Sequence, residues 1–279
     1  MSSHSTRKFV QLCLVAFLFL LPDFERKMTV DAVIPDQPTA CVGTRRSEFT
    51  MSNSVKLVEV LRNSLADCQF VIGDVHIIKI NEQEFIDQGK PFNLSFLDSI
   101  REVTGCIQII DSCFNTPISF KSLEVIRGKC DGEAITMHFM STCKMQIPPV
   151  DFRNLRYIGK GGVLVGGLKN CYLEKRINYD ELFSDAANQK FESKLECLEE
   201  KESACHESCP VWPDSKNYCW GPGSDQCQAR SKCRSIQDCV SNRCYISNGV
   251  ENCCSENCLG GCYGTSSRQC FGCTRFNKN

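Results

Sequence analysis

The sequence predicts a mostly β protein: a short right-handed β-helix, or solenoid, capped by one helix and followed by a disulfide-rich rod. Fourteen of the 22 cysteines lie between Cys197 and Cys273. Before them, short apolar strands closed by glycine recur with a period of twenty-odd to thirty residues. A single amphipathic helical pattern precedes these strands.

The N-terminus is typical of an exported chain. Two basic residues precede the apolar run Leu12–Leu21, which is too short to span a bilayer. This order is that of a secretory signal peptide, and small residues allow cleavage after Ala32. We therefore expect a signal peptide at residues 1–32, although the charges of Asp23–Lys27 leave the cleavage site open. The alternative is an uncleaved signal anchor.

The composition agrees with export. A reducing cytosol does not favour so many cysteines, and Asn93-Leu94-Ser95 is an acceptor for N-glycosylation. No other stretch is long and apolar enough to cross a membrane. The net charge of -1 gives no indication of nucleic acid or of an anionic membrane surface as partner. We expect a secreted, extracellular protein.

The residues Ser54–Leu65 are predicted to form the capping helix. Apolar side chains recur there at helical spacing, and Ser52 or Ser54 can cap its start. These side chains are Val55, Val58, Leu61 and Leu65.

Four imperfect repeats follow, each a strand, a glycine turn and a returning strand. They start at Phe70-Val71-Ile72-Gly73, Ile100-x-x-Val103-x-Gly105, Leu123-x-x-Ile126-x-Gly128 and Leu155-x-x-Ile158-Gly159. One such rung cannot bury its own apolar face, so the rungs must stack into a solenoid. Because the period is unequal, an ordinary β-sandwich stays open as the alternative.

The tail has almost no apolar run, so crosslinks must replace a core. Its cysteines form groups of four at Cys205, Cys209, Cys219 and Cys227, at Cys233, Cys239, Cys244 and Cys253, and at Cys254, Cys258, Cys262 and Cys270. Closing a loop of about fifteen residues contributes roughly 3 kcal/mol in the chain-entropy model. The adjacent pair Cys253-Cys254 is expected to face opposite ways, but spacing alone leaves many pairings open.

The tail resembles the furin-like cysteine-rich region of the epidermal growth factor receptor family. The resemblance rests on Cys205-His-Glu-Ser-Cys209-Pro, Cys219-Trp220-Gly221-Pro222-Gly223, Cys253-Cys254 and Gly261-Cys262. The preceding region resembles that family's first receptor L domain at residues 93–105 and 123–128. The insulin receptor shares both domain types, but Cys-Trp-Gly-x-Gly favours the epidermal growth factor branch. The resemblance implies an L domain at 41–197 and a truncated furin-like domain at 198–279.

The resemblance also implies how the cysteines pair. The expected disulfides are Cys41–Cys68, Cys171–Cys197, Cys205–Cys219, Cys209–Cys227, Cys233–Cys244, Cys239–Cys253, Cys254–Cys262 and Cys258–Cys270. Trp220 would insert into the last rung and lock the two domains together.

Four cysteines are additional to the family pattern, and a fifth, Cys273, lacks the partner that the pattern would give it. Since Cys106 and Cys130 fall on successive rungs, as do Cys113 and Cys143, we hypothesise that Cys106–Cys130 and Cys113–Cys143 staple the solenoid. Cys273 would open a further module, and we expect it to be unpaired. It could then link two molecules in a disulfide-bonded dimer.

The resemblance places ligand contacts on the strand after the first cysteine and on one face of the solenoid. The corresponding positions are Glu48, Thr50, Ser52, Lys79 and Asp111. They are polar, whereas the family uses more apolar and aromatic anchors, in which interface energy concentrates. Either these side chains contact a ligand of matching charge, or they are simply part of a solvated surface.

No catalytic motif is visible. The chain carries no kinase phosphate loop or catalytic loop, and the cysteine repeats without partnering histidines favour disulfides over a metal. The histidines His4, His76, His138 and His206 are scattered, with no constellation of Ser, Asp or Cys around them. We therefore expect no enzyme activity, cofactor or metal.

The sequence favours a secreted receptor-like protein that holds a growth-factor-like ligand, or pairs with a full-length receptor, and so modulates signalling. The alternative is the N-terminal fragment or a splice form of a transmembrane receptor tyrosine kinase. A structural matrix protein is a third possibility.

Overall fold

The computed structural model of the protein describes residues 38–45, 47, 53–140, 150–167, 172–194, 204–236 and 238–274. These residues form two compact units, which divide after Arg230. The predicted signal peptide lies outside the described residues. The same holds for Glu48, Thr50, Ser52, Cys143, Cys171 and Cys197.

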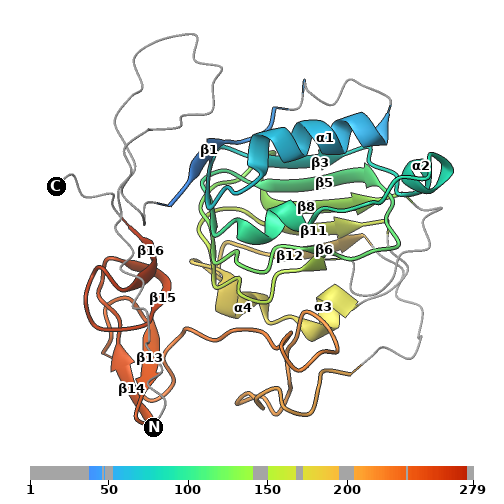
Figure 1. The fold of residues 1–279 in the computed structure, drawn as a ribbon. Helices are drawn as coiled ribbons and strands as arrows, with labels where there is room; N and C mark the ends of the chain where they lie inside the picture. Colours follow the sequence, from blue (N-terminus) through green and yellow to red (C-terminus); the bar gives the residue numbers. More distant parts are fainter. Residues whose placement is uncertain are drawn as a thin grey trace, which may run out of the picture. The chain divides into compact units, whose positions relative to one another are not determined.

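The first unit is a solenoid (Figure 1). Two of its walls are β-sheets, each made of five parallel strands. Sheet A contains, in spatial order, β1 (Ala40–Val42), β2 (Phe70–Ile72), β4 (Glu102–Val103), β7 (Val125–Ile126) and β10 (Tyr157–Ile158). Sheet B contains β12 (Phe191–Lys194), β11 (Gly162–Gly166), β8 (Glu133–Phe139), β5 (Ile107–Ser112) and β3 (Val75–Ile78). A short third pair joins β6 (Ile118–Ser119) to β9 (Val150–Asp151).

Each predicted repeat contributes one strand to sheet A and the next to sheet B. Because consecutive repeats pair in parallel and in register, the predicted stacked solenoid is confirmed, and the β-sandwich alternative is wrong. The register brings alternate side chains of sheet B together inside. Two inner rows result, Val75–Ile107–Ile135–Val163 and Ile77–Ile109–Met137–Val165, and each of their members is at most 1% exposed.

The glycines of the repeats lie where the chain turns from sheet A to sheet B. A Cβ atom at Gly105 would lie 2.6 Å from the Gly73 carbonyl oxygen, and one at Gly128 would lie 2.7 Å from the Thr104 carbonyl oxygen. Any larger residue would push the rungs apart at this corner. The recurring glycine is therefore a packing requirement of the stack.

The helix α1 (Ser54–Leu65) has the predicted bounds and covers one end of the stack beside β3 (Figure 1). Its buried face includes Leu57, Val58, Leu61 and Leu65, while Val55 is half-buried. The expected serine cap is wrong, because Asn53 is the N-cap and its Oδ1 accepts from the Lys56 N–H at 3.2 Å.

Ser54 serves instead to anchor the helix to the next turn. Its N–H donates to Glu84 Oε2 at 2.9 Å, and its Oγ accepts from the Asn81 N–H at 2.9 Å. Both partners adjoin or belong to the short helix α2 (Gln83–Asp87). The other short helices are η2 (Ser95–Ser99), a 3-10 helix, α3 (Tyr172–Arg176) and α4 (Tyr179–Leu182).

The first cysteine module, residues 204–230, packs into the same unit as the solenoid. Trp220 is 1% exposed, and its ring meets Phe152 edge to face at 5.4 Å between centroids. Phe152 in turn lies 5.2 Å from Phe120. The Cys219 N–H donates to the Arg176 carbonyl at 2.9 Å, so backbone hydrogen bonding accompanies the aromatic contact. Trp220 thus joins the module to the solenoid core, where the resemblance placed it.

We predict that Trp220→Ala lowers the free energy of unfolding of the first unit by about 3–5 kcal/mol, because it leaves a large cavity against Phe152. Urea unfolding followed by far-ultraviolet circular dichroism measures this change. The control is Val211→Ala in the same module, where the side chain is 63% exposed and the change should stay within about 0.5 kcal/mol. Equal stability of the two variants would contradict the anchoring role.

The second unit is held by disulfides around two hairpins. The first hairpin pairs β13 (Cys244–Ser247) with β14 (Val250–Cys253), and the second pairs β15 (Cys258–Cys262) with β16 (Cys270–Cys273). Its small core consists of Cys254, Cys258, Cys262, Cys270 and Cys273, with Tyr245 packed against them. Sulfur and backbone here replace the aliphatic core of the solenoid.

Among the described residues, the structure contains all seven of the implied disulfides whose cysteines are both described, and the hypothesised staple Cys106–Cys130. They are Cys41–Cys68, Cys106–Cys130, Cys205–Cys219, Cys209–Cys227, Cys233–Cys244, Cys239–Cys253, Cys254–Cys262 and Cys258–Cys270. Cys113 is also disulfide-bonded, and its hypothesised partner lies outside the described residues.

The expectation that Cys273 is unpaired is wrong. Cys273 is disulfide-bonded and 6% exposed, because it lies within β16 and faces the sulfur-rich core. A disulfide-linked dimer through a free Cys273 therefore loses its basis.

Candidate ligand-binding face

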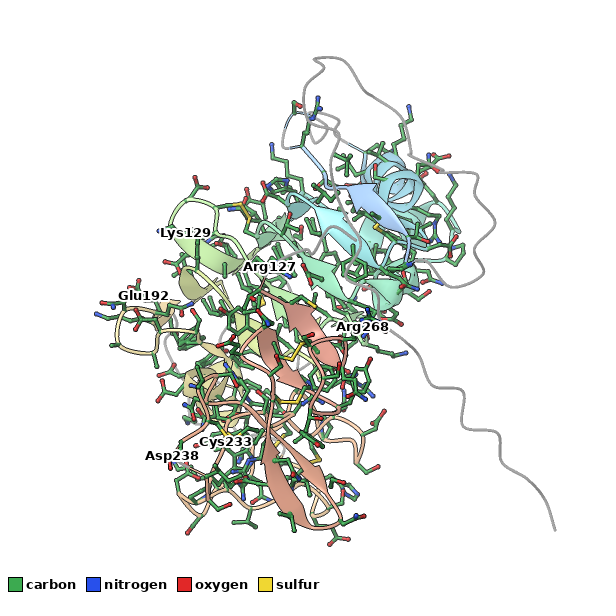
Figure 2. All side chains as sticks on the ribbon, turned by 90° about the vertical axis from the view of Figure 1, so that its left-hand side faces the viewer. Arg127, Lys129, Glu192, Cys233, Asp238 and Arg268 are labelled. Carbon is green, nitrogen blue, oxygen red and sulfur yellow. A yellow bond between two sulfur atoms is a disulfide. The ribbon has the colours of Figure 1, made fainter. Side chains whose placement is uncertain are left out.

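The outer face of sheet B combines aliphatic and polar side chains. The residues that alternate with the inner rows form two outer rows, His76–Gln108–Thr136–Leu164–Glu192 and Ile78–Ile110–His138–Gly166–Lys194. Ile78, Ile110 and Leu164 are only half-buried. Glu192 is exposed at the far end of its row (Figure 2). This face therefore combines two adjacent aliphatic side chains at its β3 end, Ile78 and Ile110, and Leu164 on β11 with polar positions between them.

Two of the five predicted contact residues lie at the strand ends of this face. Lys79 directly follows β3, and its N–H donates to the Ile110 carbonyl at 2.9 Å. Asp111 lies in the neighbouring strand β5. Both are exposed, and both adopt left-handed backbone conformations, with φ of 57° and 49°. The structure thus brings these two positions together on adjacent rungs.

A β-bulge aims Asp111 across the sheet. The register between β5 and β8 shifts between Ile110 and Ser112, so that Asp111 has no direct partner on β8. Its Oδ1 lies 3.6 Å from His138 Nδ1, and the two side chains are 55% and 57% exposed. Bulges commonly re-aim side chains in this way. His138 was not among the predicted contact positions, although it occupies an outward position in the alternation of residues 133–139.

The histidine His76 lies at the opposite, buried end of the outer rows. It is 4% exposed, and its Nδ1 lies 3.1 Å from the Thr44 carbonyl oxygen and 3.2 Å from Thr44 Oγ1. The expectation of histidines without a constellation is therefore wrong for His76 and His138. The chain folds back over sheet B at Thr44, a contact that no local sequence pattern encodes.

His76 also belongs to a cluster of possible metal ligands. Ligand atoms of Asp74, His76, Cys106 and Cys130 all lie within 4.8 Å of one another. The two sulfurs are joined in the Cys106–Cys130 disulfide, and only a thiolate is a strong metal ligand. Asp74 Oδ1 accepts from the Cys106 N–H at 3.0 Å. These residues stabilise the start of sheet B rather than forming a metal centre.

Half-buried charged side chains lie instead along sheet A. Arg101, Glu124 and Arg156 stack on successive rungs, and Arg101 Nη2 lies 2.9 Å from Glu124 Oε2. Burial raises the pKa of Glu124, against the opposing effect of Arg101, and burial lowers the pKa of Arg156. Glu102 pairs with Arg127 in the same region. These pairs lie within the fold, whereas the side chains of Lys79, Asp111 and His138 are exposed.

Part of the chain is similar to the receptor L domain. The family model of the receptor L domain matches residues 67–183, which include most strands of both sheets. This match and the similarities to whole receptors below confirm the resemblance to the ectodomains of the epidermal growth factor receptor family. The cysteine-rich part is consistent with the furin-like region.

The similarity to receptors extends over most of the chain. This chain is 28% identical over 244 residues to the epidermal growth factor receptor of Drosophila melanogaster. The match covers 85% of this chain and 16% of that receptor. It is 28% identical to the human receptor tyrosine-protein kinase erbB-4, covering 87% and 18%. It is 26% identical to a putative insulin-like peptide receptor of Hydra vulgaris, covering 93% and 17%. The chain thus spans less than a fifth of the length of these relatives.

The described helices are all short or polar. None of them combines the length and the apolar character that a membrane-spanning helix needs.

We predict that the backbone at position 111 requires a residue that tolerates a left-handed conformation. Asp111→Asn should leave the free energy of unfolding within about 0.5 kcal/mol, since Asn adopts this conformation. Asp111→Val should cost about 1–2 kcal/mol, because a β-branched side chain is strained there. Urea unfolding measures both, and equal loss in the two variants would contradict the bulge conformation.

Proposed function

We propose that this protein is a secreted, non-catalytic receptor-like protein that binds a growth-factor-like ligand and modulates signalling. The carrying observation is the outer face of sheet B, where a half-buried aliphatic patch adjoins exposed Lys79, Asp111 and His138. Apolar anchors surrounded by polar groups are typical of protein interfaces. The names of two relatives, an epidermal growth factor receptor and an insulin-like peptide receptor, support a small secreted protein as ligand.

The aliphatic patch is small, and this bears on affinity. Ile78 and Ile110 lie side by side in register, while Leu164 lies on the other outer row. No aromatic side chain stands in either outer row. Since interface energy concentrates in a few anchors, we expect modest affinity, with Lys79, Asp111 and the unplaced Glu48, Thr50 and Ser52 selecting a ligand of complementary charge.

The ligand-binding prediction is tested by placing a charge in the patch. Ile110→Lys should weaken binding at least about tenfold, because a lysine at the centre removes an apolar anchor and must be desolvated on binding. Binding of the purified chain to immobilised epidermal growth factor-type domains and insulin-like peptides is measured by surface plasmon resonance. The matched control is Val211→Lys, at a 63% exposed position in the first cysteine module.

The possible results distinguish the role of the sheet B face from the proposed growth-factor binding itself. Equal binding by Ile110→Lys and Val211→Lys would contradict the role of sheet B. The absence of saturable binding to both ligand classes would contradict growth-factor binding and favour a structural matrix role. A second pair of variants, Asp111→Asn and its control Asp67→Asn, tests the effect of charge alone. Asp67 is also exposed and has a positive φ of 61°, but it precedes sheet A and is not part of the sheet B face.

Passage through the secretory route is supported by the position of Asn93. Asn93 is exposed, its Oδ1 accepts from the Ser95 N–H at 2.7 Å, and its carbonyl accepts from Arg62 Nη2 at 2.9 Å. It precedes η2, which packs beside β6 and not on sheet B. A glycan at Asn93 would therefore leave the proposed ligand face free.

We predict that the protein secreted by a eukaryotic host carries one N-glycan, at Asn93. Enzymatic removal of N-glycans should increase its electrophoretic mobility by one step, and Asn93→Gln should abolish that step. Asn63→Gln is the control, since Asn63 is exposed on α1 but lies outside any acceptor motif. Retention of the step in Asn93→Gln, or protein found only inside the cell, would contradict the proposal.

A second candidate is supported by the share of its relatives that the chain covers. Since the chain spans 16–18% of the kinase-type receptors, it could be the N-terminal part or a splice form of a receptor tyrosine kinase. The ligand face would then serve as one half of a larger binding site. A transcript that continues past Asn279 into a transmembrane helix would favour this candidate.

A further inference from the structure

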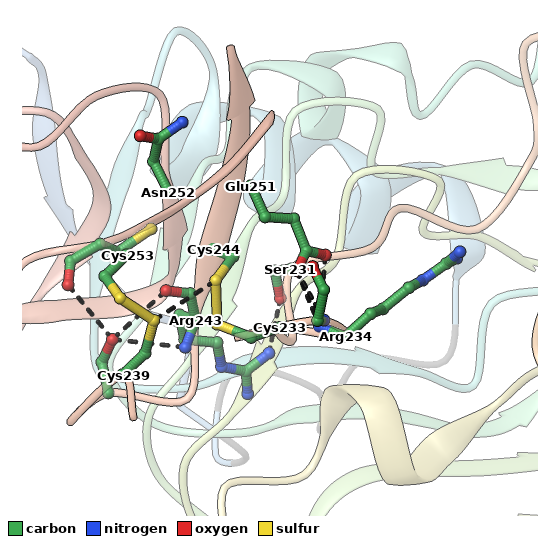
Figure 3. The surroundings of a disulfide bond; sticks show 12 residues. Ser231, Cys233, Arg234, Cys239, Arg243, Cys244, Glu251, Asn252 and Cys253 are labelled. Carbon is green, nitrogen blue, oxygen red and sulfur yellow. Dashed lines mark hydrogen bonds between the residues drawn. A yellow bond between two sulfur atoms is a disulfide. The ribbon is translucent and has the colours of Figure 1, made fainter. Parts of the chain in front are cut away.

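Two disulfides of the second unit touch each other. Cys233–Cys244 and Cys239–Cys253 are separate bridges, yet the Sγ atoms of Cys239 and Cys244 lie only 3.5 Å apart (Figure 3). Thiol–disulfide exchange proceeds by attack of a thiolate on a neighbouring disulfide sulfur. A thiolate formed at Cys239 would therefore already be in contact with a disulfide that it can attack.

The same pair of bridges contains the most accessible cysteine of the described chain. Among the cysteines whose burial the structure describes, Cys253 is the one that is classed as exposed. Its partner Cys239 is 7% exposed, and Cys244 is 8% exposed. A thiol from solution thus reaches Cys253 Sγ most easily. Its attack there makes buried Cys239 the leaving thiolate.

Backbone hydrogen bonds hold the sulfurs close when the outer bridge opens. The Asn242 N–H donates to the Cys239 carbonyl at 2.8 Å, which fixes the turn between Cys239 and β13. The Cys244 N–H donates to the Ser231 carbonyl at 2.8 Å. None of these bonds depends on the Cys239–Cys253 bridge. Cys239 therefore stays beside Cys244 and reacts within the molecule, where its effective concentration is high.

We infer that these two disulfides form a thiol–disulfide exchange relay, which accepts electrons from an extracellular dithiol reductant. A thiolate of the dithiol attacks Cys253 Sγ and releases Cys239 as a thiolate. Cys239 then attacks Cys244 Sγ, which forms a Cys239–Cys244 disulfide and releases Cys233. The second thiol of the dithiol resolves the mixed disulfide and frees Cys253.

The reaction balances as one disulfide reduced and one dithiol oxidised. The two protons of the dithiol end on Cys233 and Cys253, and its two sulfurs end in an intramolecular disulfide. Starting from two bridges, the unit retains one, now between Cys239 and Cys244. The net change is reduction together with a switch of partners.

The unit keeps its fold through this switch, because polar contacts hold the freed segment. Glu251 on β14 accepts from the Arg234 N–H at 3.1 Å, from the Ser235 N–H at 2.8 Å and from Ser235 Oγ at 2.6 Å (Figure 3). The residues after Cys233 thus stay bound to the hairpin without their disulfide. The freed Cys233 thiolate remains near Cys244 Sγ and can attack it again, which reverses the second step.

The experiment is differential alkylation of the purified full chain. The protein is exposed to a limiting amount of dithiothreitol, quenched at successive times with one alkylating label, then fully reduced and treated with a second label. Cleavage at Arg243 and at Glu251 places Cys239, Cys244 and Cys253 on three separate peptides. A non-reduced digest reports directly whether Cys239 is joined to Cys244.

The relay predicts equal early labelling of Cys233 and Cys253, with Cys239 labelled about one tenth as much or less, and a Cys239–Cys244 peptide. Equal labelling of Cys239 and Cys253 would overturn it, because that is simple reduction. Earlier labelling of another bridge, such as buried Cys258–Cys270, would overturn it as well. The variant Cys233→Ala/Cys244→Ala removes the receiving disulfide, so Cys239 and Cys253 should then label equally.

Discussion

Each rung of the solenoid is too thin to remove its own apolar side chains from water, and the structure depends on this constraint. A strand of sheet B directs two or three aliphatic residues inward, and they become buried only when the next rung stacks in register. Stacking requires close approach at the corners, which is why glycines such as Gly105 and Gly128 stand there. The helix α1 covers one end of the stack, and Trp220 is buried against Phe152 beside β9.

The cysteine modules show two ways of using disulfides. In residues 204–230 the bridges shape a loop that presents one large aromatic side chain to an existing hydrophobic core. In the second unit the sulfurs are themselves the core, since Tyr245 is the one partly buried hydrophobic residue packed against the five clustered cysteines in the described part. Outside this cluster, two further disulfides come into contact, since the Sγ atoms of Cys239 and Cys244 lie 3.5 Å apart.

The candidate ligand face results from the register in which the rungs of sheet B stack. In a parallel stack each inward row has an outward row beside it, so sheet B necessarily exposes Ile78, Ile110 and Leu164 in a regular pattern. Its outer rows also contain a bulge that turns Asp111 toward His138. The described charged pairs on sheet A, Arg101–Glu124 and Arg127–Glu102, are half-buried or buried, whereas Lys79, Asp111 and His138 at sheet B are exposed.

The sequence by itself determined the stacked repeats, the bounds of α1 and, through the family resemblance, the disulfide pairs and the place of Trp220. The repeats and the helix follow from local periodicity and from glycine at fixed offsets, which are linear properties of the chain. Cysteine spacing alone left many pairings open, and the resemblance implied the pairs and the place of Trp220. Only the tertiary structure decided that Asn53 caps α1 while Ser54 binds Glu84, and that Thr44 folds over His76. It also decided the bulge at Asp111, the bonded state of Cys273 and the contact between Cys239 and Cys244. These features depend on contacts between segments in space, and local sequence patterns do not predict such contacts.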